Sequence, residues 1–335
     1  MTGTGPSAVD EQVALVESRI DTAEVLYIGA VGRSGSTLLE RLLGVASRPV
    51  PLGELVHLWE RGVERNEPCS CRLPFRSCPF WSEVGEVAFG GWDQLDPRGV
   101  NELRRQVDRT RYLPWLARPS LAPQAWQKAR ERYLSTLLYP LYSALGQVCG
   151  PDAVLIDASK HPSYAYLLRD VEGVRLRVVH LVRDPRGVAW SWQKSVLRPE
   201  AAGGGPEQEM ERLDTLAAAG RWTSHNLAFE LLERLGVPTR LVRYEQLSRN
   251  PVATMVEATA DLDTPLTGAD FAAVTDRTVV LGTDHTVAGN PMRFSTGPLT
   301  LREDEVWRGQ LPRRDRCVLE ALTGPLRLLY DRRSA

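Results

Sequence analysis

The stretch "VLYIGAVGRSGSTLLERLLG", residues 25–44, decides the fold. An apolar run is followed by a glycine-rich turn and then by a helix pattern with leucines on one face, which ends at Gly44. In open α/β sheets such a loop lies at the carboxyl end of a strand, where backbone amides and the helix N-terminus favour an anion. The sequence therefore predicts an anion-binding loop, to which Arg33 adds a cation and Ser34, Ser36 and Thr37 add hydroxyl donors.

Three further apolar runs resemble the first: "AVLIDAS" at 153–159, "LRVVHLV" at 176–182 and "TRLVRYE" at 239–245. Nearly continuous apolar runs are typical of parallel strands that are covered on both faces. About 120 residues separate the first two runs, far more than a crossover helix needs. We predict an α/β fold: a P-loop-like parallel sheet flanked by helices, with a helical insertion (55–150) between the first two core strands. The domain would span 23–335 after a tail at 1–22.

The loop differs from that of nucleoside-triphosphate enzymes, which reads Gly, four residues, Gly-Lys-Ser/Thr. Five residues separate Gly29 from Gly35, and Ser36 stands where the lysine would be. Without that lysine the loop is poorly suited to ATP. Cationic and hydroxyl side chains nevertheless follow the other predicted strands, at the edge where the loop should lie: Lys160, His161, Arg183, Ser191, Arg243 and Tyr244.

These segments together resemble a known family. "GRSGSTLL" resembles the 5′-phosphosulfate loop of sulfotransferases that use 3′-phosphoadenosine-5′-phosphosulfate (PAPS). "VRDPRGVAWS" resembles their 3′-phosphate segment, since Arg183 is followed eight residues later by Ser191. "RYEQLSRNP" and "GNPMRF" are similar to two later motifs. The resemblance covers about 23–310 and is closest to bacterial members similar to the carbohydrate and tyrosine-ester sulfotransferases.

The resemblance implies transfer of a sulfuryl group from PAPS to a hydroxyl by in-line displacement, without a metal. The acceptor would be a small molecule, a sugar or a glycolipid, held near the 55–150 insertion. Lys160 would stabilise the leaving phosphate with support from Arg33. Glu54 is the favoured base, His161 the second choice and His57 the third. The implied cofactor-binding residues are Arg33, Ser34, Gly35, Ser36, Thr37, Arg183, Ser191, Tyr244, Asn290 and Arg293.

Other interpretations remain open at this point. Asp157, which ends "VLID", resembles the Mg²⁺ ligand of small-molecule kinases with a phosphate loop. A nucleotide-binding regulator without catalysis would keep Arg183 but not Lys160 and a base. Glu54 could instead cap the next helix. Trp222 and Asn226, at helical spacing, are expected either to face the adenine or to pack in the core.

Cys69, Cys71 and Cys78 form a C-x-C pair with a third cysteine further on. Structural zinc normally requires four ligands in paired spacings. Because no fourth ligand beyond His57 is evident, no metal is expected.

The remaining expectations come from composition. The formal net charge is −1, so no nucleic-acid partner is expected. No apolar stretch reaches the roughly 18 residues of a membrane span, and residues 1–24 do not resemble a secretory signal. Five cysteines, an odd number, fit reduced thiols. A cytoplasmic enzyme is expected, for which a homodimer would be ordinary.

Overall fold

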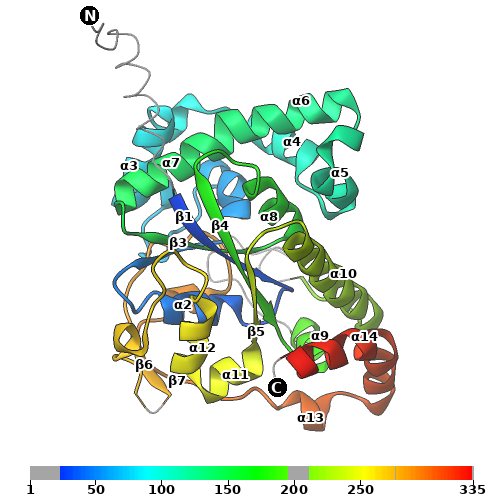
Figure 1. Ribbon diagram of the computed structural model, residues 1–335. Coiled ribbons are helices and arrows are strands. Elements are labelled where there is room, and N and C mark those ends of the chain that lie inside the picture. Colours follow the sequence, from blue (N-terminus) through cyan, green and yellow to red (C-terminus); the bar gives the residue numbers. More distant parts are fainter. Residues whose placement is uncertain (1–22, 195–210, 276, 334–335) are drawn as a thin grey trace, which may run out of the picture.

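The computed structural model describes residues 23–194, 211–275 and 277–333. The tail at 1–22 and much of the 198–220 segment, which was expected to help shape the acceptor pocket, lie outside the described residues. In the described part, five parallel strands form one sheet in the order β2-β3-β1-β4-β5 (Figure 1). The strands are β1 (Ala23–Ala30), β2 (Pro49–Gly53), β3 (Val154–Lys160), β4 (Val174–Val182) and β5 (Thr239–Arg243).

Four of these strands confirm the prediction, whereas β2 was not among the four predicted strands. Its sequence, "PVPLG", carries two prolines, which are tolerated in a sheet mainly on an edge strand. Among the strands of the sheet, β2 pairs only with β3, so it occupies the edge. Because β2 is the second strand along the chain, the helical insertion lies between the second and third strands, β2 and β3. The sequence had placed it between the first and second.

Helices cover both faces of the sheet because β1 is apolar on both sides. Val25 and Tyr27 belong to a core that contains residues of α7 (Tyr139–Cys149), α8 (Pro162–Leu168) and α10 (Thr215–Arg234). Leu26 and Ile28 belong to a second core, with α2 (Ser36–Leu43) and α12 (Pro251–Ala258). This alternation with period two places β1 in the middle of a three-layered domain.

The insertion forms a group of helices at one end of the sheet (Figure 1). Its α-helices are α3 (Pro79–Phe89), α4 (Pro97–Val107), α5 (Leu113–Ala117), α6 (Gln124–Tyr133) and α7. Buried aromatic side chains, among them Trp59, Phe75 and Trp81, join this group to the core on one face of the sheet. The predicted helical insertion is therefore confirmed, and it shares a core with the sheet.

The chain after β4 completes the domain. The helix α9 (Pro185–Gln193) is capped by the Asp184 side chain, which accepts a hydrogen bond from the Arg186 amide (2.9 Å). The other elements are α11 (Tyr244–Arg249), α13 (Trp307–Gln310), α14 (Arg313–Arg333) and an antiparallel pair, β6 (Thr278–Leu281) and β7 (Gly297–Thr300). Short 3₁₀ and π turns are η1 (Leu55–His57), η2 (Leu58–Glu64), η3 (Phe75–Ser77), η4 (Trp92–Gln94), η5 (Thr110–Tyr112), η6 (Pro119–Leu121), η7 (Leu134–Leu138), η9 (Gly268–Phe271) and η10 (Pro291–Phe294).

Among the described helices, none is both long enough and apolar enough to cross a lipid bilayer.

Candidate active site

A cavity of about 770 Å³ opens at the carboxyl ends of the central strands. That is where ligands bind in open α/β sheets, and the volume falls in the range of small-molecule sites. The loop after β1 forms one wall, and segments after β2, β3, β4 and β5 form others. Most of the predicted site residues line it: Arg33, Gly35, Ser36, Thr37, Glu54, Lys160, His161, Arg183, Ser191, Tyr244 and Asn290.

The loop after β1 is held in an unusual backbone conformation. Arg33 has a φ of 72° and Gly35 a φ of 91°, both in the left-handed region. Gly35 is required there, because a Cβ atom would lie 2.4 Å from the Tyr244 ring. The helix α2 begins directly after Gly35 with no side-chain cap, so its first amides are not satisfied by a capping side chain. The buried Ser34 hydroxyl also has no hydrogen-bond partner among the described residues. Strain and unsatisfied donors at one loop are typical of an anion site.

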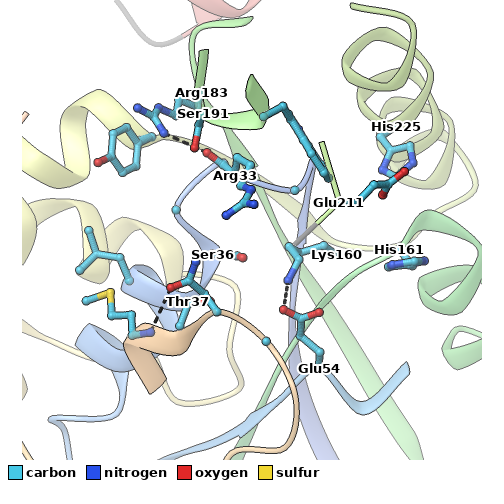
Figure 2. Close-up of a pocket in the computed structure, with 18 of the residues that line it drawn as sticks. Arg33, Ser36, Thr37, Glu54, Lys160, His161, Arg183, Ser191, Glu211 and His225 are labelled. Atoms are coloured by element: carbon cyan, nitrogen blue, oxygen red, sulfur yellow. Dashed lines mark hydrogen bonds and ion pairs between the residues drawn. The ribbon is translucent and has the colours of Figure 1, made fainter. Parts of the chain in front are cut away.

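Lys160 and Glu54 form an ion pair in the cavity (Figure 2). Lys160 ends β3 with a φ of 66°, a left-handed conformation that is uncommon for a residue other than glycine. Burial by itself would raise the pKa of Glu54, but the charge of Lys160 and the hydrogen bond that Lys160 donates lower it below its ordinary value. Although Glu54 lies at the N-cap position of η1, its side chain makes no capping bond. The helix-cap interpretation of Glu54 is therefore wrong.

Three histidine side chains line the cavity near this ion pair. The His57 Nε2 atom lies 3.6 Å from Glu54 Oε2, and its ring meets that of His161 edge-on at a centroid distance of 5.5 Å. The His161 ring also lies 6.5 Å from that of His225. Burial lowers the pKa of both His57 and His225 to about 4, and it holds that of His161 well below its ordinary value. At neutral pH all three imidazoles are uncharged, and each can donate or accept a hydrogen bond.

Arg183 lies on the opposite wall and is held by three contacts (Figure 2). Its guanidinium donates to the Arg33 carbonyl and to Asp304, both at 2.9 Å. It also stacks on the Tyr244 ring, 4.5 Å from the ring centroid. Ser191 reaches the same cavity from α9. Arg183 and Ser191, which are eight positions apart, therefore line the same cavity, as the family resemblance implies.

Two predicted binding residues do not line the cavity. Ser34 is buried behind the loop, and Arg293 is only 1% exposed. The Arg293 guanidinium donates to the carbonyls of Thr286 (3.0 Å) and Pro68 (2.8 Å), which holds two loops together. The structure therefore gives Arg293 a structural position in place of the predicted contact with the cofactor.

Trp222 and Asn226 belong to the core. The Trp222 indole donates to the Arg183 carbonyl (3.0 Å), and the Asn226 amide oxygen lies 2.8 Å from His180 Nε2. The neighbouring stripe of the same helix, Arg221 and His225, lines the cavity instead. The core alternative for Trp222 and Asn226 is therefore confirmed. Residues four apart lie on one helix face, and the face that lines the cavity is shifted by one residue.

Some cavity residues were not found from the sequence. Trp192 follows Ser191 on α9, and its ring packs between the guanidinium groups of Arg33 (5.4 Å) and Arg221 (5.2 Å). Arg61 reaches the cavity from η2. The position of Trp192 directly after the predicted binding residue Ser191 could have indicated that it lies in the cavity. Nothing in the spacing of η2, a π turn, indicated Arg61.

The lining carries a marked excess of positive charge, although the chain as a whole has a formal net charge of −1. Among the described lining side chains two are carboxylates, Glu54 and Glu211. Six are cationic: Arg33, Arg61, Lys160, Arg183, Arg221 and Arg302. Low-dielectric walls concentrate such a field, so the cavity favours a multiply charged anion.

Asp157, the possible magnesium ligand, is outside the cavity lining and fully buried. It accepts hydrogen bonds from the Tyr142 hydroxyl (2.6 Å) and the Ser159 amide (2.9 Å). Burial raises its pKa to about 6. A carboxylate enclosed in this way does not face a phosphate in the cavity.

The cysteine segment does have a fourth potential ligand. Cys69, Cys71, Cys78 and His285 place one donor atom each within 4.8 Å of one another. His285 was not found from the sequence because it is 207 residues from Cys78. His57, the fourth ligand considered from the sequence, lies in the cavity instead. The expectation of no metal therefore rested on an incomplete ligand count.

No family model and no curated protein matches this chain. Among solved structures, the chain is similar to the sulfotransferase domain from the curacin biosynthetic pathway, with 19% identity over 91% of this chain and 97% of that one and a TM-score of 0.48. It is also similar to the sulfotransferase domain of the olefin synthase from Synechococcus PCC 7002, with 19% identity over 89% and 92% of the two chains and a TM-score of 0.47. A third similar structure is a sulfotransferase from Mycobacterium avium, with 16% identity over 78% and 71% and a TM-score of 0.41. Sulfotransferases are thus the structural neighbours of this chain.

Proposed function

We propose that the protein is a PAPS-dependent sulfotransferase acting on a hydroxyl of a small-molecule, sugar or glycolipid acceptor. One observation carries the proposal: the glycine-rich loop after β1, Arg183 with Ser191, and a lysine–carboxylate pair all line one cationic cavity. PAPS carries its charge in two places, at the 5′-phosphosulfate and at the 3′-phosphate. A cavity with cationic groups on opposite walls suits that distribution.

The chain offers groups for each end of the nucleotide. The loop amides, with Ser36 and Thr37, would hold the 5′-phosphosulfate at the N-terminus of α2. Arg183 and Ser191 would hold the 3′-phosphate, which distinguishes PAPS from ordinary adenine nucleotides. Trp192, on the same wall, packs against the guanidinium groups of Arg33 and Arg221 and so helps to position both cations. Tyr244 supports Arg183, and Asn290 also lines the cavity.

The chemistry proposed for the site needs two protein groups. Glu54 accepts the proton of the acceptor hydroxyl as that oxygen bonds to sulfur, and a positioned base is worth about 10² to 10⁴ in rate. Lys160 donates to the bridging oxygen as the sulfur–oxygen bond to the phosphate breaks and negative charge develops there. Loss of such a donor typically costs about 3 to 4 kcal/mol of barrier. Arg33 adds its charge from the loop.

The insertion supplies the acceptor side of the proposed site. His57, Arg61 and Thr110 belong to the predicted 55–150 insertion, and all three line the cavity. His57 lies 3.6 Å from Glu54, beside the ion pair that the hydroxyl must approach. Neutral His57 and His161 can donate or accept a hydrogen bond to a polar acceptor.

The two alternative functions have less support. A kinase would need a magnesium ligand, and the Asp157 carboxylate is enclosed in the core. A regulator without catalysis would not need a base paired with a lysine inside its nucleotide site, and the cavity contains both Glu54 and Lys160.

The first test is calorimetric titration of the full chain with 3′-phosphoadenosine-5′-phosphate (PAP), AMP and ATP with Mg²⁺. The proposal predicts micromolar binding of PAP, much weaker binding of AMP, and no effect of Mg²⁺ on ATP. Tight, Mg²⁺-dependent binding of ATP without preference for PAP would refute it. Release of PAP from PAPS in the presence of phenol, sugar and lipid hydroxyl acceptors then identifies the acceptor class.

A further inference from the structure

Three cysteines of one loop and a distant histidine converge outside the cavity. Cys69 and Cys78 are fully buried, and Cys71 and His285 are partly buried. The Sγ atoms of Cys71 and Cys78 lie 3.6 Å apart, and the His285 Nδ1 atom lies 3.2 Å from Cys78 Sγ and 3.9 Å from Cys69 Sγ.

These separations match a tetrahedral zinc site. Zinc bonds of about 2.3 Å to sulfur and about 2.0 Å to nitrogen at tetrahedral angles place ligand sulfurs about 3.8 Å apart and sulfur and nitrogen about 3.6 Å apart. A disulfide would require sulfurs about 2.05 Å apart. We propose that Cys69, Cys71, Cys78 and His285 bind a structural Zn²⁺ ion.

The ligand set selects zinc and a structural role. Thiolates and imidazole are the donors that zinc prefers, and three cysteines with one histidine is a known set for closed structural sites. Four protein ligands leave no open position for water or substrate, as a catalytic zinc would require. None of the four side chains lines the cavity.

Polar contacts already hold the two ligand-bearing segments together. The Ser70 hydroxyl donates to the Asp284 carbonyl (2.6 Å), and the Trp81 indole donates to the His285 carbonyl (2.7 Å). The Phe80 ring stacks on the His285 ring at a centroid distance of 5.3 Å, which fixes the orientation of the imidazole. The ligands are therefore pre-positioned, as outer-shell contacts commonly achieve in metal sites.

The ion would stabilise the position of the segment that carries His285, and this segment supports the proposed catalytic cavity. Two residues after His285, Val287 exchanges hydrogen bonds with the strand that precedes Glu54: its carbonyl accepts from the Glu54 amide (2.8 Å), and its amide donates to the Leu52 carbonyl (2.9 Å). Asn290, further along the same segment, lines the cavity. Zinc would therefore join the first turns of the insertion to the segment that positions Glu54.

The test is the zinc content of the full chain, purified under reducing conditions without chelator and measured by mass spectrometry. We expect about one zinc per chain in the wild type and in Cys149→Ser, which removes a partly buried thiol outside the cluster. Cys71→Ser and His285→Asn should lose their zinc to a competing chelator at least about tenfold more readily, since changes to outer-shell partners alone cost that much. Tetrahedral thiolate absorption after loading with Co²⁺ should appear in the wild type and Cys149→Ser only.

Two outcomes would overturn the proposal: a folded wild type that neither holds zinc nor takes up Co²⁺, or ligand variants that retain zinc as tightly as the wild type. PAP binding measured on the same samples keeps this test separate from that of the sulfotransferase function. If one of the two proposals fails, the other can still be tested by its own measurement.

Discussion

Replacing Arg183 with lysine should selectively weaken recognition of a 3′-phosphate. The arginine uses a planar fork: one nitrogen donates to the Arg33 carbonyl and another to Asp304, while the plane stacks on Tyr244. Lysine keeps the charge but loses the fork and the stacking. A charge-assisted hydrogen bond contributes about 1.5 to 3 kcal/mol, so the affinity for PAP should fall about 10-fold to 150-fold. The affinity for AMP, which lacks the 3′-phosphate, should change little.

Calorimetric titration of each variant with PAP and with AMP measures this difference. Arg186→Lys is the matched control, because Arg186 lies three residues after Arg183, in the first turn of α9, but pairs with Asp184 and Glu320, outside the main cavity. Asp304→Asn removes a carboxylate that competes for Arg183, and it should strengthen PAP binding by up to about fivefold. Equal losses for PAP and AMP in Arg183→Lys would refute the reasoning, since the arginine would then act only by holding the Arg33 loop.

Three further predictions concern the ion pair and the core. Lys160→Met should lower PAPS turnover by about 10²-fold to 10³-fold with little change in PAP affinity. Equal losses of turnover and of the PAP affinity measured by calorimetry would contradict its role at the leaving oxygen. Glu54→Gln should lower turnover by about 10²-fold to 10⁴-fold, and a larger loss in His161→Asn would transfer the role of base to that histidine. Burial lowers the pKa of His180 to about 4, so its contribution to stability is present above its ordinary value of 6.5 and is lost as the pH falls. His180 accounts for about 1.4 kcal/mol of the stability lost one pH unit below that value, so the loss measured by urea unfolding should be smaller by about that amount in His180→Asn than in the wild type.

Four of the strands could be predicted because apolar runs buried on both faces are distinctive. The same reasoning explains why β2 could not be predicted. β2 has prolines at positions 49 and 51 and only one neighbouring strand, so neither its composition nor its burial resembles the central strands. The location of the site at the carboxyl ends of the strands could also be predicted. Lys160 and Arg183 end parallel strands or directly follow them, and the carboxyl ends of parallel strands meet at one edge.

Side-chain direction and distant contacts could not be predicted from the sequence. Arg221 and His225 differ from Trp222 and Asn226 by one position on the same helix, and only the packing of α10 decides which stripe faces the cavity. Arg293 belongs to a recognisable motif, but a motif does not state where its side chain points. Residues far apart in the chain, as His285 is from the cysteines, leave no local pattern at all.

The ion pairs of the cavity bear on how the proposed reaction is controlled. Before a nucleotide binds, Lys160 is paired with Glu54 and Arg183 with Asp304. The charge of Lys160 is a main reason why the pKa of Glu54 lies below its ordinary value, and burial acts in the opposite direction. When Lys160 turns toward a developing phosphate charge, its influence on the carboxylate weakens while burial remains, so the pKa of Glu54 rises. Glu54 would therefore become a stronger base only in the loaded site, because the same lysine serves the leaving group and restrains the base.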